Sequence, residues 1–88
     1  MVNHKVTVLN QMGLHTRPVK EIVKTAGGFR SEILIKRETK TANAKSFVST
    51  IALGAARGTE LLLTAEGEDE EQALREIVEL FENKFGED

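Results

Sequence analysis

The chain has 88 residues, of which 40% are hydrophobic and 30% charged, and its formal net charge is −2. This length allows one domain with a small core, and the mixed composition is typical of a folded protein rather than a disordered one. The weakly acidic balance and the four Phe, which are the only aromatic residues, argue against nucleic acid as a partner. Because cysteine is absent, disulfides, thiolate metal sites and cysteine nucleophiles are excluded.

The N-terminal segment lacks the apolar stretch of a signal peptide, and no run is long enough to span a bilayer. We therefore expect one domain over residues 1–88 that is a cytoplasmic monomer without membrane insertion. His4 lacks a matching set of ligands, and the acidic run 66–71 lacks the spacing of an EF-hand. We expect no metal ion and no other cofactor.

The first half of the chain predicts a strand, a helix and two further strands. Polar and apolar residues alternate over residues 5–9, which favours a strand with Val6 and Val8 facing the core. Residues 31–36 and 41–44 are typical of strands joined by a polar turn. Between the first two strands, helical spacing that stops at Gly27-Gly28 predicts an amphipathic helix with an apolar face of Val19, Ile22, Val23 and Ala26.

The second half predicts a short helix, a strand and a C-terminal helix. Ser46 precedes a brief apolar stripe that ends at Gly54, which indicates a helix with Ser46 as its N-cap. Residues 59–66 favour a fourth strand. Asp69 followed by Gln72 resembles a capping box, which predicts a last helix with an apolar face of Leu74, Ile77, Val78 and Phe81. The order βαββαβα predicts an α+β fold with helices on one face of an antiparallel sheet.

The segment that suggests chemistry is GLHTRP at residues 13–18, which places His15 at the start of the first helix. A helix N-terminus stabilises an anion through its unpaired N–H groups and its dipole, so we expect the Thr16 backbone N–H to bind a phosphoryl group. Neutral imidazole is nucleophilic near pH 7 and its phosphoramidate is a reactive donor. The Arg17 guanidinium can neutralise phosphoryl oxygens as a clamp. Plainer explanations are a polar helix start for His15 and a solvated charge for Arg17.

A second group of residues fits a docking surface. Lys20 and Lys24 continue a basic stripe from Arg17, which suits either an acidic partner or plain solubility. On the short helix, Phe47, Val48 and Ile51 are candidates for partner contact, and core packing is an equally good explanation of the apolar side chains there.

Ser46 is a candidate for regulatory phosphorylation. Its role as an N-cap, which contributes about 1 kcal/mol, by itself explains a serine at this position. A phosphoryl group at Ser46 would lie at the positive end of the helix and would add about −2 charge to the neighbouring docking surface.

Four motifs support a family resemblance: GLHTRP at residues 13–18, GF-x-SEI at residues 28–33, AKS at residues 44–46 and AEGEDE at residues 65–70. Together they cover nearly the whole chain and resemble HPr, the histidine-containing phosphocarrier of the bacterial phosphotransferase system. The resemblance implies an open-faced β-sandwich, with a four-stranded antiparallel sheet covered on one face by three helices.

The resemblance also implies a function. Enzyme I, charged by phosphoenolpyruvate, would phosphorylate His15 on Nδ1, and sugar-specific enzyme IIA proteins would accept the group with the help of Arg17. In some relatives, an HPr kinase/phosphorylase phosphorylates a serine matching Ser46 and creates a surface for a transcriptional regulator. Such a carrier is not an enzyme in the strict sense, because its partners consume and regenerate it.

Two other functions compete with sugar transport. One is a regulatory module of the same fold, like the nitrogen-type paralogues, which controls a dedicated partner through its phosphorylation state. The partner distinguishes the two: a transport carrier phosphorylates a sugar-type enzyme IIA, whereas a regulatory module prefers its dedicated partner. The other is a ferredoxin-like module that binds a small ligand or RNA, and the lack of an aromatic platform and the His15 loop argue against it.

Overall fold

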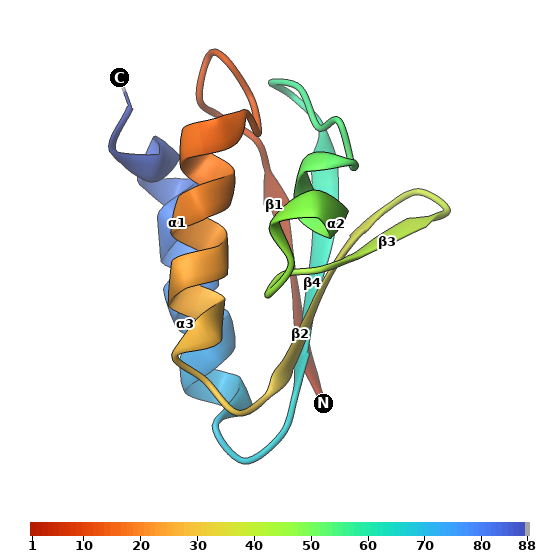
Figure 1. Ribbon diagram of the computed structural model, residues 1–88, viewed down its shortest axis with the longest axis vertical. Coiled ribbons are helices and arrows are strands. Elements are labelled where there is room, and N and C mark those ends of the chain that lie inside the picture. The colour runs from red at the N-terminus through yellow and green to blue at the C-terminus, as the bar shows by residue number, and fades with distance from the viewer. Residues whose placement is uncertain (88) are drawn as a thin grey trace.

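A four-stranded antiparallel sheet carries helices on one face in the computed structural model, which describes residues 1–87 (Figure 1). The elements are β1 (Val2–Thr7), α1 (Thr16–Gly27), β2 (Glu32–Arg37), β3 (Lys40–Asn43), α2 (Phe47–Ile51), β4 (Glu60–Glu66), α3 (Glu70–Glu82) and a 3₁₀ turn, η1 (Lys84–Gly86). The predicted open-faced sandwich with the order βαββαβα is confirmed. No helix within residues 1–87 has the length and apolar character needed to cross a membrane.

The strands are ordered β1-β4-β2-β3, so β4 lies between β1 and β2. Strand β1 begins earlier than the predicted residues 5–9, because Val2 already pairs with Ala65 of β4. Beyond the end of β1, the Val8 N–H donates to the Thr59 carbonyl at 2.9 Å, which continues the ladder. The antiparallel ladder therefore runs the full length of β1 and into the loop that follows it.

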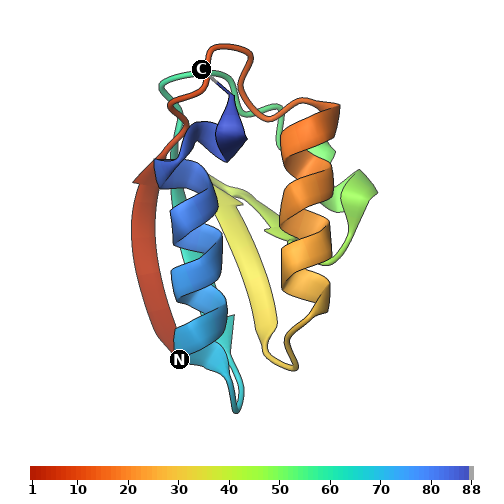
Figure 2. The same cartoon turned by 90° about the vertical axis from the view of Figure 1, so that its left-hand side faces the viewer.

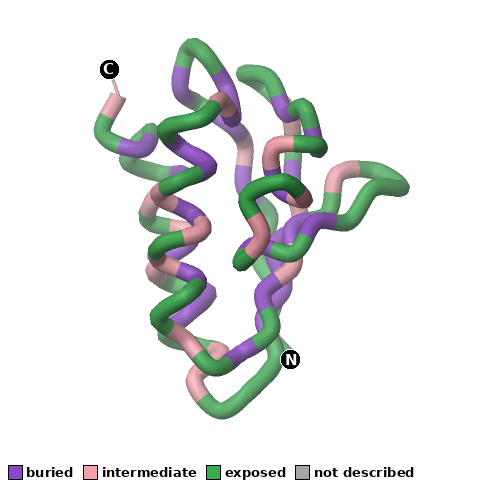
Figure 3. The backbone as a smooth tube through the Cα atoms, in the orientation of Figure 1, coloured by how far each residue is buried: buried purple, intermediate pink, exposed green. Residues whose placement is uncertain are grey.

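Helices α1 and α3 lie side by side over the sheet (Figure 2). Buried residues recur along both helices and along the strands, while exposed residues dominate the loops (Figure 3). The predicted helix positions Val23 and Val78 are only partly buried at the edge of this core. The core between the two layers is formed by alternate strand residues and one face of each helix, including Ile33, Ile35, Leu61, Leu63, Val19, Ile22, Ala26, Ile77 and Phe81.

The turn η1 was not predicted. It follows α3 and buries Phe85, whose ring packs edge-on against Phe81 with the ring centroids 4.9 Å apart. Lys84 and Phe85 have φ angles of 53° and 56°, which L-residues rarely adopt. Burial of the Phe85 ring compensates for this backbone strain. The helical spacing of apolar residues in the sequence does not predict this turn.

The predicted capping box at the start of α3 is wrong. The Asp69 side chain makes no capping bond and instead accepts hydrogen bonds from the Arg30 N–H at 2.9 Å, the Ser31 N–H at 3.0 Å and the Ser31 hydroxyl. Gln72 donates to Glu76. The loop before β2 comes so close that a Cβ on Gly67 would lie 2.7 Å from Ser31 Cα. Asp69 therefore ties the α1–β2 connection to the start of α3.

This contact predicts an acid-dependent stability. The Ser31 hydroxyl and the Arg30 N–H lower the pKa of Asp69 from 3.8 to about 2. Ionised Asp69 therefore stabilises the fold above pH 3.8, and this contribution is lost as the pH falls toward about 2. We expect Asp69→Asn to lower the melting temperature at neutral pH. The difference in melting temperature between this variant and the unsubstituted protein should shrink as the pH approaches 2.

The measurement is thermal unfolding followed by circular dichroism across that pH range. Glu71→Gln is the matched control, because Glu71 is exposed at the start of the same helix. A difference in melting temperature between Asp69→Asn and the unsubstituted protein that stays constant down to the lowest pH would contradict the expectation.

Candidate functional site

Three segments that are distant in the sequence meet at the N-terminal end of α1: the β1–α1 loop, the α2–β4 loop and the residues after α3 (Figures 1 and 2). The Leu14 N–H donates to the Ala55 carbonyl at 2.8 Å and joins the two loops. Gly13 has a φ of 69°, and a Cβ there would lie 2.7 Å from the Ala55 oxygen. The close approach of these loops therefore requires glycine at position 13 and determines where His15, two residues further on, is placed.

His15 is the N-cap residue of α1, with extended backbone angles. Its side chain makes no capping hydrogen bond and is 32% exposed, so the imidazole is available for chemistry. Its carbonyl accepts from the Val19 N–H at 3.2 Å and begins the helix. The N–H groups of Thr16 and Arg17 lie in the first turn, where a helix provides no acceptor for them.

Glu87 contacts the imidazole and Asn10 contacts Glu87, and the sequence analysis assigned a role to neither residue. His15 Nε2 lies 2.8 Å from Glu87 Oε2, and the other carboxylate oxygen of Glu87 accepts from Asn10 Nδ2 at 3.0 Å. Asn10 is fully buried, and its Nδ2 also donates to the Gly13 carbonyl at 2.7 Å. No local pattern indicates the contact between His15 and Glu87, because 72 positions separate them.

The surroundings of Glu87 favour the ionised form of its carboxyl group. Desolvation opposes the charge, but the hydrogen bonds from Asn10 and His15 and the electrostatic attraction of His15 and Arg17 outweigh it and lower the pKa of Glu87 below its ordinary value. The imidazole therefore faces a carboxylate, which can only accept a hydrogen bond.

Arg17 lies at the same end of the molecule as His15. Its two terminal nitrogens donate to the Phe85 carbonyl at 2.8 and 2.9 Å. The left-handed backbone of Lys84 and Phe85 belongs to the turn that presents this carbonyl. The structure thus brings together the predicted residues His15, Thr16 and Arg17 and adds Asn10 and Glu87 to them.

The candidate docking residues lie on two helices that pack against each other, α1 and α2. Lys20 and Lys24 are exposed on α1, and Val48 is 74% exposed on α2, whereas Ile51 is partly buried. Phe47 is also exposed.

Ser46 is the N-cap of α2, as predicted, and its hydroxyl accepts from the Ser49 N–H at 3.2 Å. Two apolar residues of the β1–α1 loop, Leu9 and Met12, are also exposed. The sequence analysis did not include these loop residues among the docking candidates.

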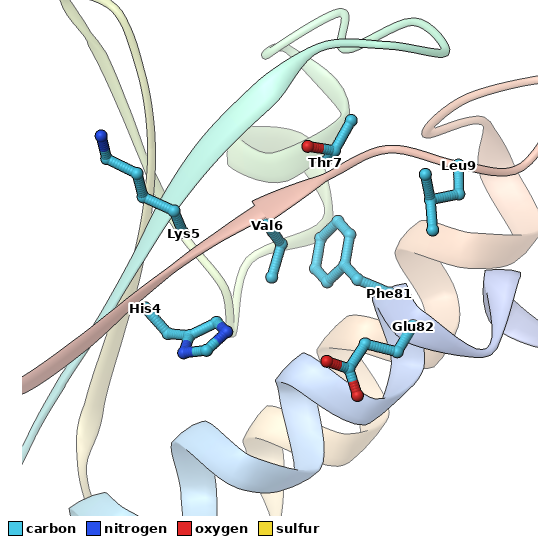
Figure 4. Close-up of a pocket in the computed structure, with 7 residues that line it drawn as sticks. All are labelled: His4, Lys5, Val6, Thr7, Leu9, Phe81 and Glu82. Atoms are coloured by element: carbon cyan, nitrogen blue, oxygen red, sulfur yellow. The ribbon is translucent and has the colours of Figure 1, made fainter.

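A separate groove of about 260 Å³ lies between β1 and the end of α3. Figure 4 shows Val6 pointing toward the Phe81 ring in it, so core packing accounts for its apolar floor. His15 and Arg17 do not line this groove. Within residues 1–87, no cluster of three or more acidic or histidine side chains is arranged to hold a metal ion. The side chains that could contact phosphate therefore lie on an open surface.

Comparisons with known proteins identify the family of this chain. A family model described as "PTS HPr component phosphorylation site" matches residues 2–83. The chain is 47% identical over 88 residues to the phosphocarrier protein HPr of Treponema pallidum, with all of both chains covered. The crystal structure of HPr-C-His from Thermoanaerobacter tengcongensis is similar with a TM-score of 0.96 and 41% identity, covering 100% of this chain and 99% of that one.

A second crystal structure from Thermoanaerobacter tengcongensis, described as an HPr dimer, is similar with a TM-score of 0.80 and 41% identity, covering 99% of this chain and all of that one. The matching relatives are named phosphocarrier proteins, which are carriers and not enzymes. The chain therefore belongs to the HPr family, the phosphocarrier proteins of the phosphotransferase system.

Proposed function

We propose that enzyme I, charged by phosphoenolpyruvate, phosphorylates His15 on Nδ1, and that a sugar-specific enzyme IIA then accepts the group. One observation carries this proposal: the partly exposed His15 ring stands at the N-terminus of α1 with its Nε2 already bonded to Glu87. Because a carboxylate accepts only, Nε2 carries the proton, and Nδ1 is the nitrogen with the lone pair that attacks phosphorus.

The neighbouring groups neutralise the phosphoryl charge in this proposal. The Thr16 N–H and the positive end of α1 bind one side of the group. Arg17 carries five N–H donors and shares its terminal nitrogens with the Phe85 carbonyl, so donors remain for phosphoryl oxygens. Positioning and charge neutralisation are the main requirements of phosphoryl transfer, and this surface supplies both.

Residues at the surface of α1 and α2 support a docking surface for the two partners. The exposed Lys20 and Lys24 would attract acidic side chains, while the exposed Phe47 and Val48 and the partly buried Ile51 would contact apolar ones. We propose that the carrier is a monomer when it docks, although several similar structures are described as dimers. Because phosphoenolpyruvate is produced in the cytoplasm, the proposed exchange takes place there.

We also propose that Ser46 is a regulatory site on this surface. It adjoins Phe47 and Val48, both exposed, so a phosphoryl group on Ser46 would place negative charge where a partner docks. An HPr kinase/phosphorylase would add the group, and a transcriptional regulator would be its reader.

Replacement of His15 tests the central proposal. The protein is incubated with enzyme I, phosphoenolpyruvate and magnesium, and its mass is then measured by intact mass spectrometry. We expect one acid-labile phosphoryl group on the unsubstituted protein and on His4→Ala, the matched control, and none on His15→Ala. A phosphoryl group on His15→Ala, or none on the unsubstituted protein with a competent enzyme I, would refute the proposal.

Replacement of Arg17 tests the clamp. We expect Arg17→Ala to slow transfer by about 10- to 100-fold, because a hydrogen bond to a charged group contributes about 1.5 to 3 kcal/mol. Rapid-quench measurement of transfer from enzyme I and to enzyme IIA checks this, with Arg57→Ala as the exposed control in the α2–β4 loop. Unchanged rates in both directions would remove Arg17 from the mechanism.

Replacement of Ser46 tests the regulatory site. Ser46→Asp should weaken binding to enzyme I several-fold while the fold stays stable, because Asp is itself a good N-cap. Ser46→Asn is the neutral control that caps equally well. Isothermal titration calorimetry measures both affinities, and equal affinities for the Asp and Asn variants would argue against a docking surface at Ser46.

A further inference from the structure

Both the carboxylate and the backbone of Glu87 are held in place. One carboxylate oxygen accepts from Asn10 and the other faces His15 Nε2, so both oxygens are engaged. The backbone N–H of Glu87 donates to the Lys84 carbonyl at 2.9 Å, and Phe85, two residues earlier, is anchored by its buried ring and by Arg17. Glu87 therefore approaches His15 from a segment whose position the core determines.

Asn10 is suited to hold this carboxylate. Its Nδ2 has two partners, the Gly13 carbonyl and the Glu87 carboxylate, and both are acceptors. In the opposite amide orientation, Oδ1 would face the Gly13 carbonyl oxygen and a Glu87 carboxylate oxygen, and none of the three could donate a hydrogen bond. The hydrogen-bond partners therefore determine the orientation of the amide. Oδ1 is buried and has no hydrogen-bond partner among residues 1–87, which is the energetic cost of directing the amide donors at Glu87.

We propose that Glu87, held by Asn10, is a positioning residue that keeps a proton on His15 Nε2 both before and after phosphorylation. The inference rests on the proposed phosphorylation of His15 at Nδ1 and deepens it. In the free protein, the carboxylate orients the ring and selects the neutral tautomer that has its lone pair on Nδ1.

The same contact acts during transfer. The Nδ1 lone pair forms the bond to phosphorus while the bond between phosphorus and the donor atom of enzyme I breaks, and the donor keeps the bonding electrons. The Nε2 proton does not move, so the phosphorylated ring carries a formal positive charge, which the Glu87 carboxylate stabilises. When enzyme IIA attacks, the ring departs as neutral imidazole and needs no further proton. Loss of the Nε2 proton to water would leave a poorer leaving group.

The titratable groups that act on the Glu87 carboxylate are His15 and Arg17. Glu87 Oε2 faces His15 Nε2, and Arg17 of α1, whose guanidinium donates to the Phe85 carbonyl, attracts the carboxylate. The α2–β4 loop contributes the backbone of Ala55 and Ala56 to the contact with Gly13. Glu87 is thus the group through which the pH dependence of the phosphorylated ring is set.

The test uses Glu87→Gln, which keeps the shape and removes the charge, with Glu82→Gln as the control at an exposed position near the end of α3. Nitrogen-15 NMR of the unphosphorylated protein reports the His15 tautomer without any partner. We expect the Nε2–H tautomer alone in the unsubstituted protein and in Glu82→Gln, and a mixture with the Nδ1–H tautomer in Glu87→Gln. A second variant, Glu87→Ala, should show the same mixture.

The second readout is transfer from phosphorylated protein to enzyme IIA as a function of pH. In Glu87→Gln, we expect the pH at which the rate falls by half to move to a lower value, and transfer at neutral pH to slow by about tenfold, the effect expected for loss of one hydrogen bond to a charged group. Identical tautomers and superimposable pH profiles for Glu87→Gln and Glu82→Gln would overturn the inference. Failure of the unsubstituted protein to accept phosphate would instead refute the proposed function, and the tautomer measurement would still decide the role of Glu87.

Discussion

The position of His15 depends on the close approach of the Gly13 backbone to Ala55. This contact joins the β1–α1 loop to the α2–β4 loop and is possible only because Gly13 has no Cβ. The loop then enters α1 at a fixed angle, with His15 as the N-cap and its side chain free of any capping role. The helix terminus, the imidazole and the first-turn N–H groups therefore share one small region of the surface, where an anion is favoured.

A carboxylate beside a phosphate acceptor is at first sight unfavourable, because the two negative charges repel. The imidazole separates them: Glu87 lies at Nε2, and the proposed phosphoryl group is on Nδ1, next to Thr16 and Arg17. A positive ring between two negative groups is a favourable arrangement. The fully buried Asn10 holds one oxygen of this carboxylate, and the other oxygen lies at His15 Nε2.

The open character of the site fits a carrier whose partners must supply the rest of the chemistry. His15 lies on a surface with exposed apolar side chains such as Met12 and Val48 rather than in the groove between β1 and α3. Each docking partner can therefore exclude water from the same histidine in turn. The small core has enough apolar residues to fill the space between sheet and helices and leaves these others at the surface.

The sequence by itself determined the order of the strands and of α1, α2 and α3, the core face of the strands and of the two long helices, and the segment with the proposed phosphate acceptor, because hydrophobic periodicity, glycine stops and the Ser46 cap are local signals. It placed the capping role of Asp69 wrongly, since the donors of Ser31 and Arg30 come from a distant loop. Only the tertiary structure decided the surroundings of His15. Glu87 and Phe85 reach the site because the sheet and the α1–α3 packing return the chain to its starting end, and no local pattern encodes a contact across 72 residues.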